Sequence, residues 1–279
     1  MIQLPDIQDK RKLIDYLIEN KSALIAQKKS AIKRADAVSY YPQLVTEKGD
    51  VSKAVASINP DATKIKVRSI INTTKFFDSH GDVHIDQLWN KSLKESKDFY
   101  LVAEHDFGYK GIITDNVKAF AKQMDWTELG YTFEGQTQAL VFDSVIDKMD
   151  EDFPSAKDYF SRYKNGKVKN HSVGMQYVKM DLAVNDDRYE KEFAIWNKYA
   201  PQIANKDAAV ENGYFWAVTE AKIIEGSAVV RGSNSATPTQ SIMETKSDEP
   251  DSSTHTEPRK HSESDEFQKR VLNLLITLK

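Results

Sequence analysis

Two separate segments contain the residue types needed for hydrolysis by a serine nucleophile. Ser172 lies in the β-prone run 168–178, and His105 follows a run that predicts a strand and then a turn. The chain has no cysteine, so an oxygen or a lysine must serve as any protein nucleophile. Serine and histidine that are distant in sequence can meet in the fold, because catalytic triads are defined by geometry and not by chain order. Ser172 and His105 are therefore a candidate nucleophile and general base.

The residues after Ser172 are candidates for an oxyanion hole. Gly174 allows the backbone to approach a substrate closely, and the N–H groups of Val173 and Gly174 are candidate donors to a developing oxyanion. A Ser-x-Gly triplet and a histidine beside an aspartate both occur often by chance. The spacing alone therefore gives a hypothesis that depends on the elements around these residues.

The composition predicts a polar protein that works in a cytoplasm. The 279 residues include 39 basic and 42 acidic side chains, and the net charge of -3 gives no support for a nucleic-acid-binding protein, which usually carries a basic excess. No run approaches the roughly 18 apolar residues of a membrane-spanning helix, and the first residues lack the apolar core of a signal peptide. The absence of cysteine excludes disulfides and thiolate metal sites.

The apolar pattern divides the chain into four parts. Residues 1–60 form an N-terminal arm, in which apolar side chains recur every three or four positions from about 9 to 37 and predict a helix. Residues 61–232 contain the folded domain. Residues 233–265 are rich in serine, threonine, proline and charge, which predicts a disordered linker. Residues 266–279 regain apolar side chains and predict a short helix that docks onto a partner.

Within the folded domain, short β-prone runs are separated by turn-rich stretches. Strands are expected at about 65–71, 99–103, 126–133, 138–142, 168–182 and 214–230, and helices at about 86–94, 144–163 and 187–204. This order favours an α+β fold whose core is a closed, mostly antiparallel β-barrel or a sandwich. A doubly wound parallel sheet is not expected.

Four motifs, taken in order, resemble those of a known family. They are an acidic, turn-rich segment before a Leu/Trp helix (78–93), a strand ending in His-Asp (101–106), a strand with Ser-Val-Gly-Met (172–175) and a Thr-Glu-x-x-Ile-x-Glu-x-Ser-x-Val strand (219–229). Their order and spacing, over about residues 64–235, resemble the prohead (capsid maturation) serine proteases of tailed bacteriophages. These enzymes are distant relatives of the herpesvirus assemblins.

The resemblance implies a herpesvirus-protease-like barrel with flanking helices, and it implies roles for individual residues. Ser172 matches the family's nucleophile and His105 matches its general base. The third member is an acidic residue in the late strand, which is Glu220 or Glu225 in this chain. Because these glutamates are five positions apart, they point to opposite faces of a regular strand, and one of them alone can reach His105. Glu220 is the preferred choice and Glu225 is the alternative.

The resemblance also implies a biological setting. Proteases of this family cleave scaffold or capsid protein, and often themselves, inside the immature phage capsid. For this chain it implies scaffold and major capsid proteins as substrates, homo-oligomers as one option, no cofactor, and no nucleic-acid or membrane partner. The location implied is the host cytoplasm, inside the assembling prohead. The long insert at about 185–212 and the Gly-Ser-Asn at 232–234, in place of the usual Pro-Ala, depart from the family pattern.

One alternative function is a metal-dependent hydrolase. His80, His84 and His105, with Asp82 and Asp86, provide imidazole and carboxylate groups of the kind that hold zinc or manganese. On a strand, however, His80 and His84 would lie about 13 Å apart on one face.

Two further alternatives retain parts of the same interpretation. The terminal helices and the tether suit a catalytically inactive scaffold or assembly protein with the same fold. A serine esterase is less well matched, because no Gly-x-Ser-x-Gly motif surrounds Ser172. His171 precedes Ser172 directly and would point away from it on a strand, so a structural role is expected for His171.

Overall fold

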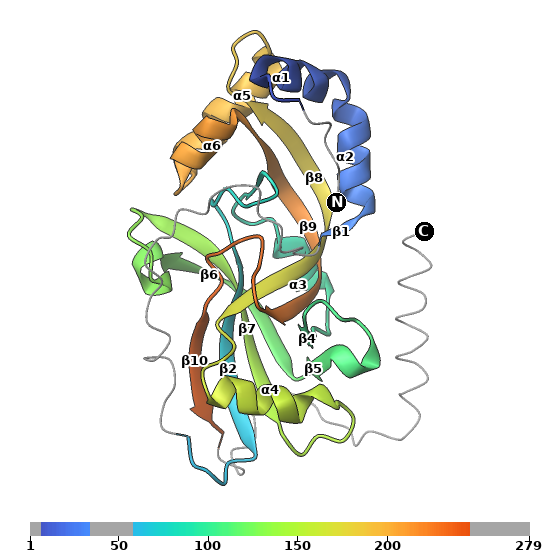
Figure 1. Cartoon of the computed structure of the whole chain (residues 1–279), viewed down its shortest axis with the longest axis vertical. Coiled ribbons are helices and arrows are strands. Elements are labelled where there is room, and N and C mark those ends of the chain that lie inside the picture. The colour runs from blue at the N-terminus through green and yellow to red at the C-terminus, as the bar shows by residue number, and fades with distance from the viewer. Residues whose placement is uncertain (1–6, 34–57, 246–279) are drawn as a thin grey trace. The chain divides into compact units, whose positions relative to one another are not determined.

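The computed structural model describes residues 7–33 and 58–245, and Figure 1 shows their arrangement. These residues form six α-helices and two β-sheets, which confirms the expected α+β class. The helices are α1 (Lys10–Glu19), α2 (Lys21–Ser30), α3 (Asn90–Glu95), α4 (Ser155–Lys164), α5 (Glu190–Tyr199) and α6 (Lys206–Asn212). The expected docking helix at 266–279, the linker from 246 onward and much of the arm lie outside the described residues.

The strands belong to a six-stranded and a four-stranded sheet. The first has the order β1 (Ile32–Lys33), β8 (Asn170–Val184), β9 (Tyr214–Val229), β4 (Leu101–Ala103), β5 (Ile112–Thr114), with β3 (Asp82–His84) also paired to β9. The second has the order β10 (Thr239–Glu244), β2 (Lys64–Thr73), β7 (Gln136–Asp147), β6 (Val117–Asp125). Most neighbours are antiparallel, whereas β3 and β4 run parallel to β9.

The described strands do not close into a barrel, so this part of the prediction is wrong. Each sheet keeps open edges, and the edge strand β6 exposes lysines that disfavour pairing with a further strand. The two sheets meet at residues 237–238. The carbonyl of Thr237 accepts from the N–H of His171 on β8 at 3.0 Å, and the carbonyl of Pro238 accepts from Ile70 on β2 at 3.1 Å. A pattern of short strands predicts the sheets but not whether their edges join.

Aromatic packing decides the structure of the segment after β6. A strand was expected at 126–133, but Trp126–Leu129 forms a 3-10 turn, η3, with a capping box between Asp125 and Glu128. The turn places the ring of Trp126 6.1 Å from that of Tyr131, in a buried cluster. Burying these large rings outweighs the β propensity of the aromatic residues.

The 185–212 insert lies at the end of the β8–β9 ladder that is remote from Ser172. Val184 pairs with Tyr214 there, and α5 and α6 form most of the connection. At a rise of about 3.3 Å per residue, Val184 lies about 40 Å along β8 from Ser172. Trp196 of α5 belongs to the apolar cluster that covers this end. The insert therefore packs on the remote half of the ladder.

The N-terminal arm docks onto the six-stranded sheet. Within the described residues, the helix expected at 9–37 is two helices separated by Asn20. Asp9 caps α1, and its carboxylate accepts from two backbone N–H groups at 2.9 and 3.1 Å. Lys28 on α2 reaches Asp82 on β3, with 2.6 Å between Nζ and Oδ1. The short strand β1 then pairs with β8. The arm is therefore held by an ion pair and by strand pairing.

The folded domain extends beyond residue 232, so the predicted start of the linker at 233 is wrong. Residues 239–244 form β10, which pairs antiparallel with β2. The polar residues just before it are buried, because the fold supplies their hydrogen bonds: the amide of Asn234 donates to Asn72 Oδ1 at 2.8 Å and to the Thr73 carbonyl at 3.0 Å. Polar composition therefore does not indicate disorder in this segment.

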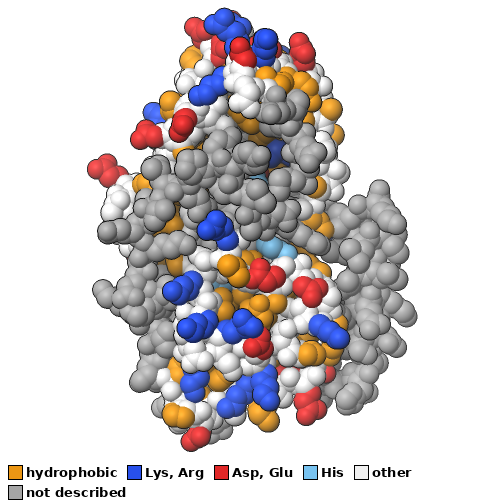
Figure 2. Space-filling view, in the orientation of Figure 1, with side chains coloured by type: hydrophobic (Ala, Val, Ile, Leu, Met, Phe, Trp, Pro, Cys, Tyr) orange, Lys and Arg blue, Asp and Glu red, His pale blue; other side chains and the backbone are white. Residues whose placement is uncertain are grey.

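The surface carries charges of both signs. Figure 2 shows basic and acidic side chains interspersed with apolar ones on one face, in keeping with the net charge of -3. Large apolar side chains that are exposed come from separate elements: Tyr109, Met149, Val178, Val210, Val230 and Met243. None of the helices in 7–33 and 58–245 is long and apolar enough to cross a membrane.

Candidate active site

Ser172 shares one face of the β8–β9 ladder with two polar residues of β9. It pairs directly with Ser227, and Glu225 lies two residues earlier on the same strand. Side chains of directly paired residues project to the same face, with Cβ atoms about 4.5–5.5 Å apart, and residues two apart on a strand share that face. Ser172 is 5% exposed and Glu225 is 1% exposed. The ladder therefore brings a serine hydroxyl and a buried carboxylate together.

His105 reaches this group from a left-handed turn. The strand β4 runs parallel to β9 and ends at Ala103, and the N–H of Asp106 then donates to the Ala103 carbonyl at 2.8 Å. The two central residues of the turn, Glu104 and His105, have φ of 47° and 60°. Residues other than glycine seldom adopt a positive φ, although asparagine, aspartate and histidine do so more often than the others, and such conformations are concentrated at functional sites. The turn points the imidazole at β9.

The imidazole of His105 contacts Glu225 and Ser227. Its Nδ1 lies 2.5 Å from Oε1 of Glu225 and 3.2 Å from Oγ of Ser227. The Ser227 hydroxyl donates to the second carboxylate oxygen, Oε2, at 2.7 Å, and it accepts the backbone N–H of His105 at 3.1 Å. Ser172 pairs with Ser227 across the ladder and therefore lies on the same face as Glu225 and Ser227.

Glu225, and not the preferred Glu220, is the partner of His105. Glu220 forms ion pairs with Lys179 and with Lys91, the second at 3.7 Å. The hydrogen bond from Lys179 lowers the pKa of the Glu220 carboxyl. The sequence correctly predicts that only one glutamate reaches His105, and the preference for Glu220 is corrected.

Gly174 makes room for the carboxylate of Glu225. The two residues pair directly in the ladder, and a Cβ atom added at 174 would lie 2.2 Å from Oε1 of Glu225 and 2.8 Å from its Cδ. No side chain fits at that distance. The Ser-x-Gly spacing was attributed to close approach of a substrate. In the fold, the glycine also leaves the space that the Glu225 side chain occupies where it contacts His105.

The two candidate oxyanion donors point in opposite directions. The N–H of His171 leaves β8 on the side away from β9, toward the Thr237 carbonyl. Because N–H groups alternate sides along a strand, the N–H of Val173 also points away from β9, whereas that of Gly174 faces its partner Glu225. Val173 therefore remains a candidate oxyanion donor, whereas the N–H of Gly174 is directed toward β9 within the ladder.

His171 has a structural role, as its position on the strand predicts. Its ring is fully buried, stacks on Tyr163 with centroids 6.0 Å apart and lies 3.0 Å from the Tyr163 hydroxyl through Nε2. Burial lowers the pKa of His171 to about 4. It is therefore neutral and fixed in the core.

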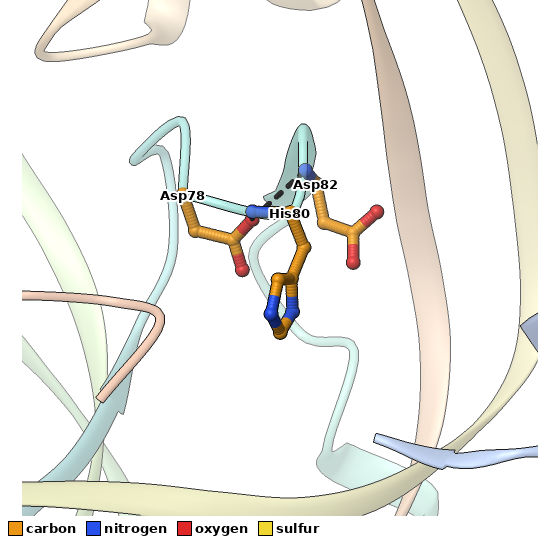
Figure 3. Close-up of side chains that lie close together, drawn as sticks. All are labelled: Asp78, His80 and Asp82. Atoms are coloured by element: carbon orange, nitrogen blue, oxygen red, sulfur yellow. Dashed lines mark hydrogen bonds between the residues drawn. The ribbon is translucent and has the colours of Figure 1, made fainter. Parts of the chain in front are cut away.

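The histidines proposed as metal ligands are not brought together. In the described part of the chain, one group of three such side chains is close enough to hold an ion: Asp78, His80 and Asp82, with ligand-type atoms within 4.8 Å of one another (Figure 3). His84 is not a member of this group, because its Nδ1 lies 3.0 Å from the Asn72 amide and its Nε2 lies 3.2 Å from the Tyr177 hydroxyl. The metal site of His80, His84 and His105 that the sequence predicts is therefore not formed by these described residues.

The Asp78, His80 and Asp82 group already has charge and hydrogen-bond partners. The ammonium of Lys28 lies against one oxygen of Asp82, and the Tyr177 hydroxyl donates to the other at 2.7 Å. Oδ1 of Asp78 accepts from the backbone N–H groups of His80 and Asp82, each at 2.9 Å. Burial and the charge of Asp82 raise the pKa of Tyr177, so this phenol stays protonated as a donor. These contacts explain why the three side chains lie close together: they belong to a largely buried turn that pairs with Lys28.

Sequence reasoning missed two residues that build these sites. Ser227 is in the 219–229 motif, and the two-residue period of a strand places it on the face of Glu225, which is a signal that was present. Tyr177 gave no such signal, because its contact with Asp82 depends on the parallel pairing of β3 with β9.

Comparison with known proteins adds no assignment. No protein-family model, curated protein or solved structure matches this chain. The chemistry of the site therefore follows from its own geometry. A buried carboxylate on Nδ1 orients the His105 imidazole as the general base of a catalytic triad is oriented, and Ser172 lies on the same face of the ladder.

Proposed function

We propose that this protein is a serine endopeptidase in which Ser172 is the nucleophile, His105 the general base and Glu225 the residue that orients it. The 2.5 Å contact between Nδ1 of His105 and Oε1 of Glu225, on the face of the ladder that carries Ser172, supports this most directly. A carboxylate on Nδ1 leaves Nε2 to take a proton, which is the arrangement of a serine protease triad.

The proposed reaction proceeds in two transfers. Oγ of Ser172 attacks the peptide carbonyl carbon while Nε2 of His105 takes the hydroxyl proton, and the N–H of Val173 stabilises the oxyanion. The C–N bond breaks as His105 gives that proton to the leaving amine, and an acyl-enzyme forms. Water, deprotonated by His105, then releases the acid and restores Ser172. Glu225 stabilises the imidazolium in both steps.

The biological role that we propose is cleavage of scaffold or capsid protein, and of the chain itself, inside a phage prohead. The four motifs at 78–93, 101–106, 172–175 and 219–229 support this, because they resemble the phage prohead proteases in order and spacing. The fold would then be an open relative of the herpesvirus protease, in which two sheets meet at Pro238 without closing.

Intact mass measured over time tests this proposal. Wild type and Ser172→Ala are incubated alone and with the scaffold and major capsid proteins of the same source. We expect wild type to shorten itself or a partner and Ser172→Ala to leave every mass unchanged. Ser144→Ala is a matched control, since Ser144 is also buried but lies on β7 in the other sheet.

Other outcomes favour the remaining functions. If every mass stays unchanged with wild type, the protein is an inactive scaffold or assembly protein. If wild type and Ser172→Ala cut equally and EDTA stops both, a metal-dependent hydrolase is supported, and His80→Ala becomes the variant to examine. With the proposed mechanism, EDTA leaves the cleavage rate unchanged.

A further inference from the structure

Ser227 occupies the centre of the contacts that hold His105 and Glu225. Its side chain is fully buried, and its hydroxyl oxygen lies within hydrogen-bond distance of three separate groups. They are the Glu225 carboxylate oxygen Oε2 at 2.7 Å, the His105 backbone N–H at 3.1 Å and the His105 imidazole Nδ1 at 3.2 Å. A serine on the outer face of this strand would make none of these contacts.

The proton of the Ser227 hydroxyl decides the direction of these hydrogen bonds. A hydroxyl has one proton, and the carboxylate of Glu225 can only accept, so this proton goes to Oε2. The oxygen of Ser227 must then accept from its other neighbours. Nδ1 of His105 therefore faces two acceptors, Ser227 Oγ and Glu225 Oε1, and it carries the imidazole proton. In the neutral ring the lone pair is then on Nε2, as a general base requires.

Ser227 also supports the strained turn. His105 has φ of 60°, and its N–H would lie buried beside β9 without the Ser227 oxygen. A buried donor that loses its acceptor is costly. The hydrogen bond from this N–H to Ser227 therefore favours the left-handed conformation that directs the ring toward Glu225.

We propose that Ser227 is the positioning residue of the site: it fixes the His105 backbone, the Glu225 carboxylate and the protonated nitrogen of the ring at the same time. This inference rests on the proposed function for its effect on catalysis. Ser227 is fully buried, and its proton is engaged with Glu225, so it is not the nucleophile.

Steady-state cleavage by Ser227→Ala, Ser227→Cys and Ser144→Ala tests the positioning role. We expect Ser227→Ala to lower kcat about 100-fold with little change in KM, since a small misplacement of a reacting group has an effect of that order. Ser227→Cys retains the shape with a poorer hydrogen-bonding group and should fall between Ser227→Ala and wild type. Ser144→Ala should match wild type. Equal kcat in wild type and Ser227→Ala would overturn the proposal.

Nitrogen-15 NMR of the labelled histidines gives a second readout that does not depend on cleavage. Wild type should show the neutral His105 ring protonated at Nδ1, with a downfield proton resonance that Ser227→Ala shifts or loses by exchange. If wild type cleaves no peptide but shows this difference, the proposed function fails and the positioning role stands. If the His105 signals are identical in both proteins, the positioning role is wrong whatever the activity.

Discussion

Gly174 and Glu225 lie directly opposite each other in the β8–β9 ladder, and the Glu225 side chain occupies the space that a Cβ atom at 174 would fill. Gly174, two residues after Ser172, therefore leaves the space in which the Glu225 side chain contacts His105. A methyl group at this position would lie 2.2 Å from Oε1 of Glu225, so the carboxylate must move away. Replacing Gly174 and removing the Glu225 carboxylate should then both take the carboxylate away from Nδ1 of His105.

Gly174→Ala should destabilise the fold by about 1–3 kcal/mol, which is typical of overpacking a filled site, and should abolish the reactivity of Ser172. The double variant Gly174→Ala/Glu225→Ala separates the two effects. Because the carboxylate is gone, the alanine should then cost little stability relative to Glu225→Ala alone. Urea unfolding of the four proteins measures this coupling. Additive changes in the free energy of unfolding would contradict the contact.

Glu225→Gln and Glu220→Gln form a matched pair on one strand. A fluorophosphonate bonds covalently to activated serine hydroxyls, so its rate of reaction with Ser172 reports activation without any knowledge of the substrate. Glu225→Gln should slow this reaction by about 10³ to 10⁴ fold, the order found when the carboxylate of a triad is replaced by an amide. Glu220→Gln should react like wild type, because Glu220 contacts lysines and not His105. Equal rates in the two variants would refute the assignment of Glu225.

Lys28→Met should destabilise the protein by about 3–5 kcal/mol, since it leaves the buried carboxylate of Asp82 without its cation. The Lys28 side chain is 14% exposed and that of Asp82 is 1% exposed. Lys179→Met is the comparison, because the Lys179 side chain is 70% exposed and its pair with Glu220 is screened by water. Urea midpoints should fall for Lys28→Met and stay near wild type for Lys179→Met. A wild-type midpoint for Lys28→Met would show that the arm does not depend on this ion pair.

His171 should make stability fall in mild acid. Its pKa is about 4 in the folded protein and 6.5 in the unfolded chain, so the unfolded state binds the proton first as the pH falls. The stabilisation is complete above pH 6.5 and is lost between pH 6.5 and 4, by about 3 kcal/mol over that window. His171→Gln should remove this part of the pH dependence. The same slope of unfolding free energy against pH in both proteins would rule out His171 as its source.

The sequence predicts the elements that carry the candidate site residues better than it predicts how those elements pair. The strand that carries Ser172, the strand-then-turn at His105 and the late strand with two glutamates all follow from local patterns, and the structure contains them. The choice between Glu220 and Glu225 could not be made, because the period of a strand says that they face opposite sides but not which side faces β4. That depends on the parallel pairing of β4 with β9, which joins segments far apart in the chain.

Long-range pairing also explains the errors in the fold. The polar segment after 232 predicts a linker, yet the Asn234 amide bonds to Asn72 on β2, which lies 162 residues earlier in the chain. The expected ligand set of His80, His84 and His105 is not assembled, and Lys28 of the arm lies beside Asp82. Composition shows which side chains require hydrogen-bond or charge partners, and the fold determines which residues provide those partners.

Covalent labelling followed by peptide mapping tests the activation of Ser172 by His105 most directly. Wild type and His105→Ala are treated with a fluorophosphonate, digested, and examined by mass spectrometry for the modified residue. We expect a single modification at Ser172 in wild type and a loss of labelling in His105→Ala. Labelling at another serine, equal labelling of Ser172 in both proteins, or none in wild type would each contradict the proposed site.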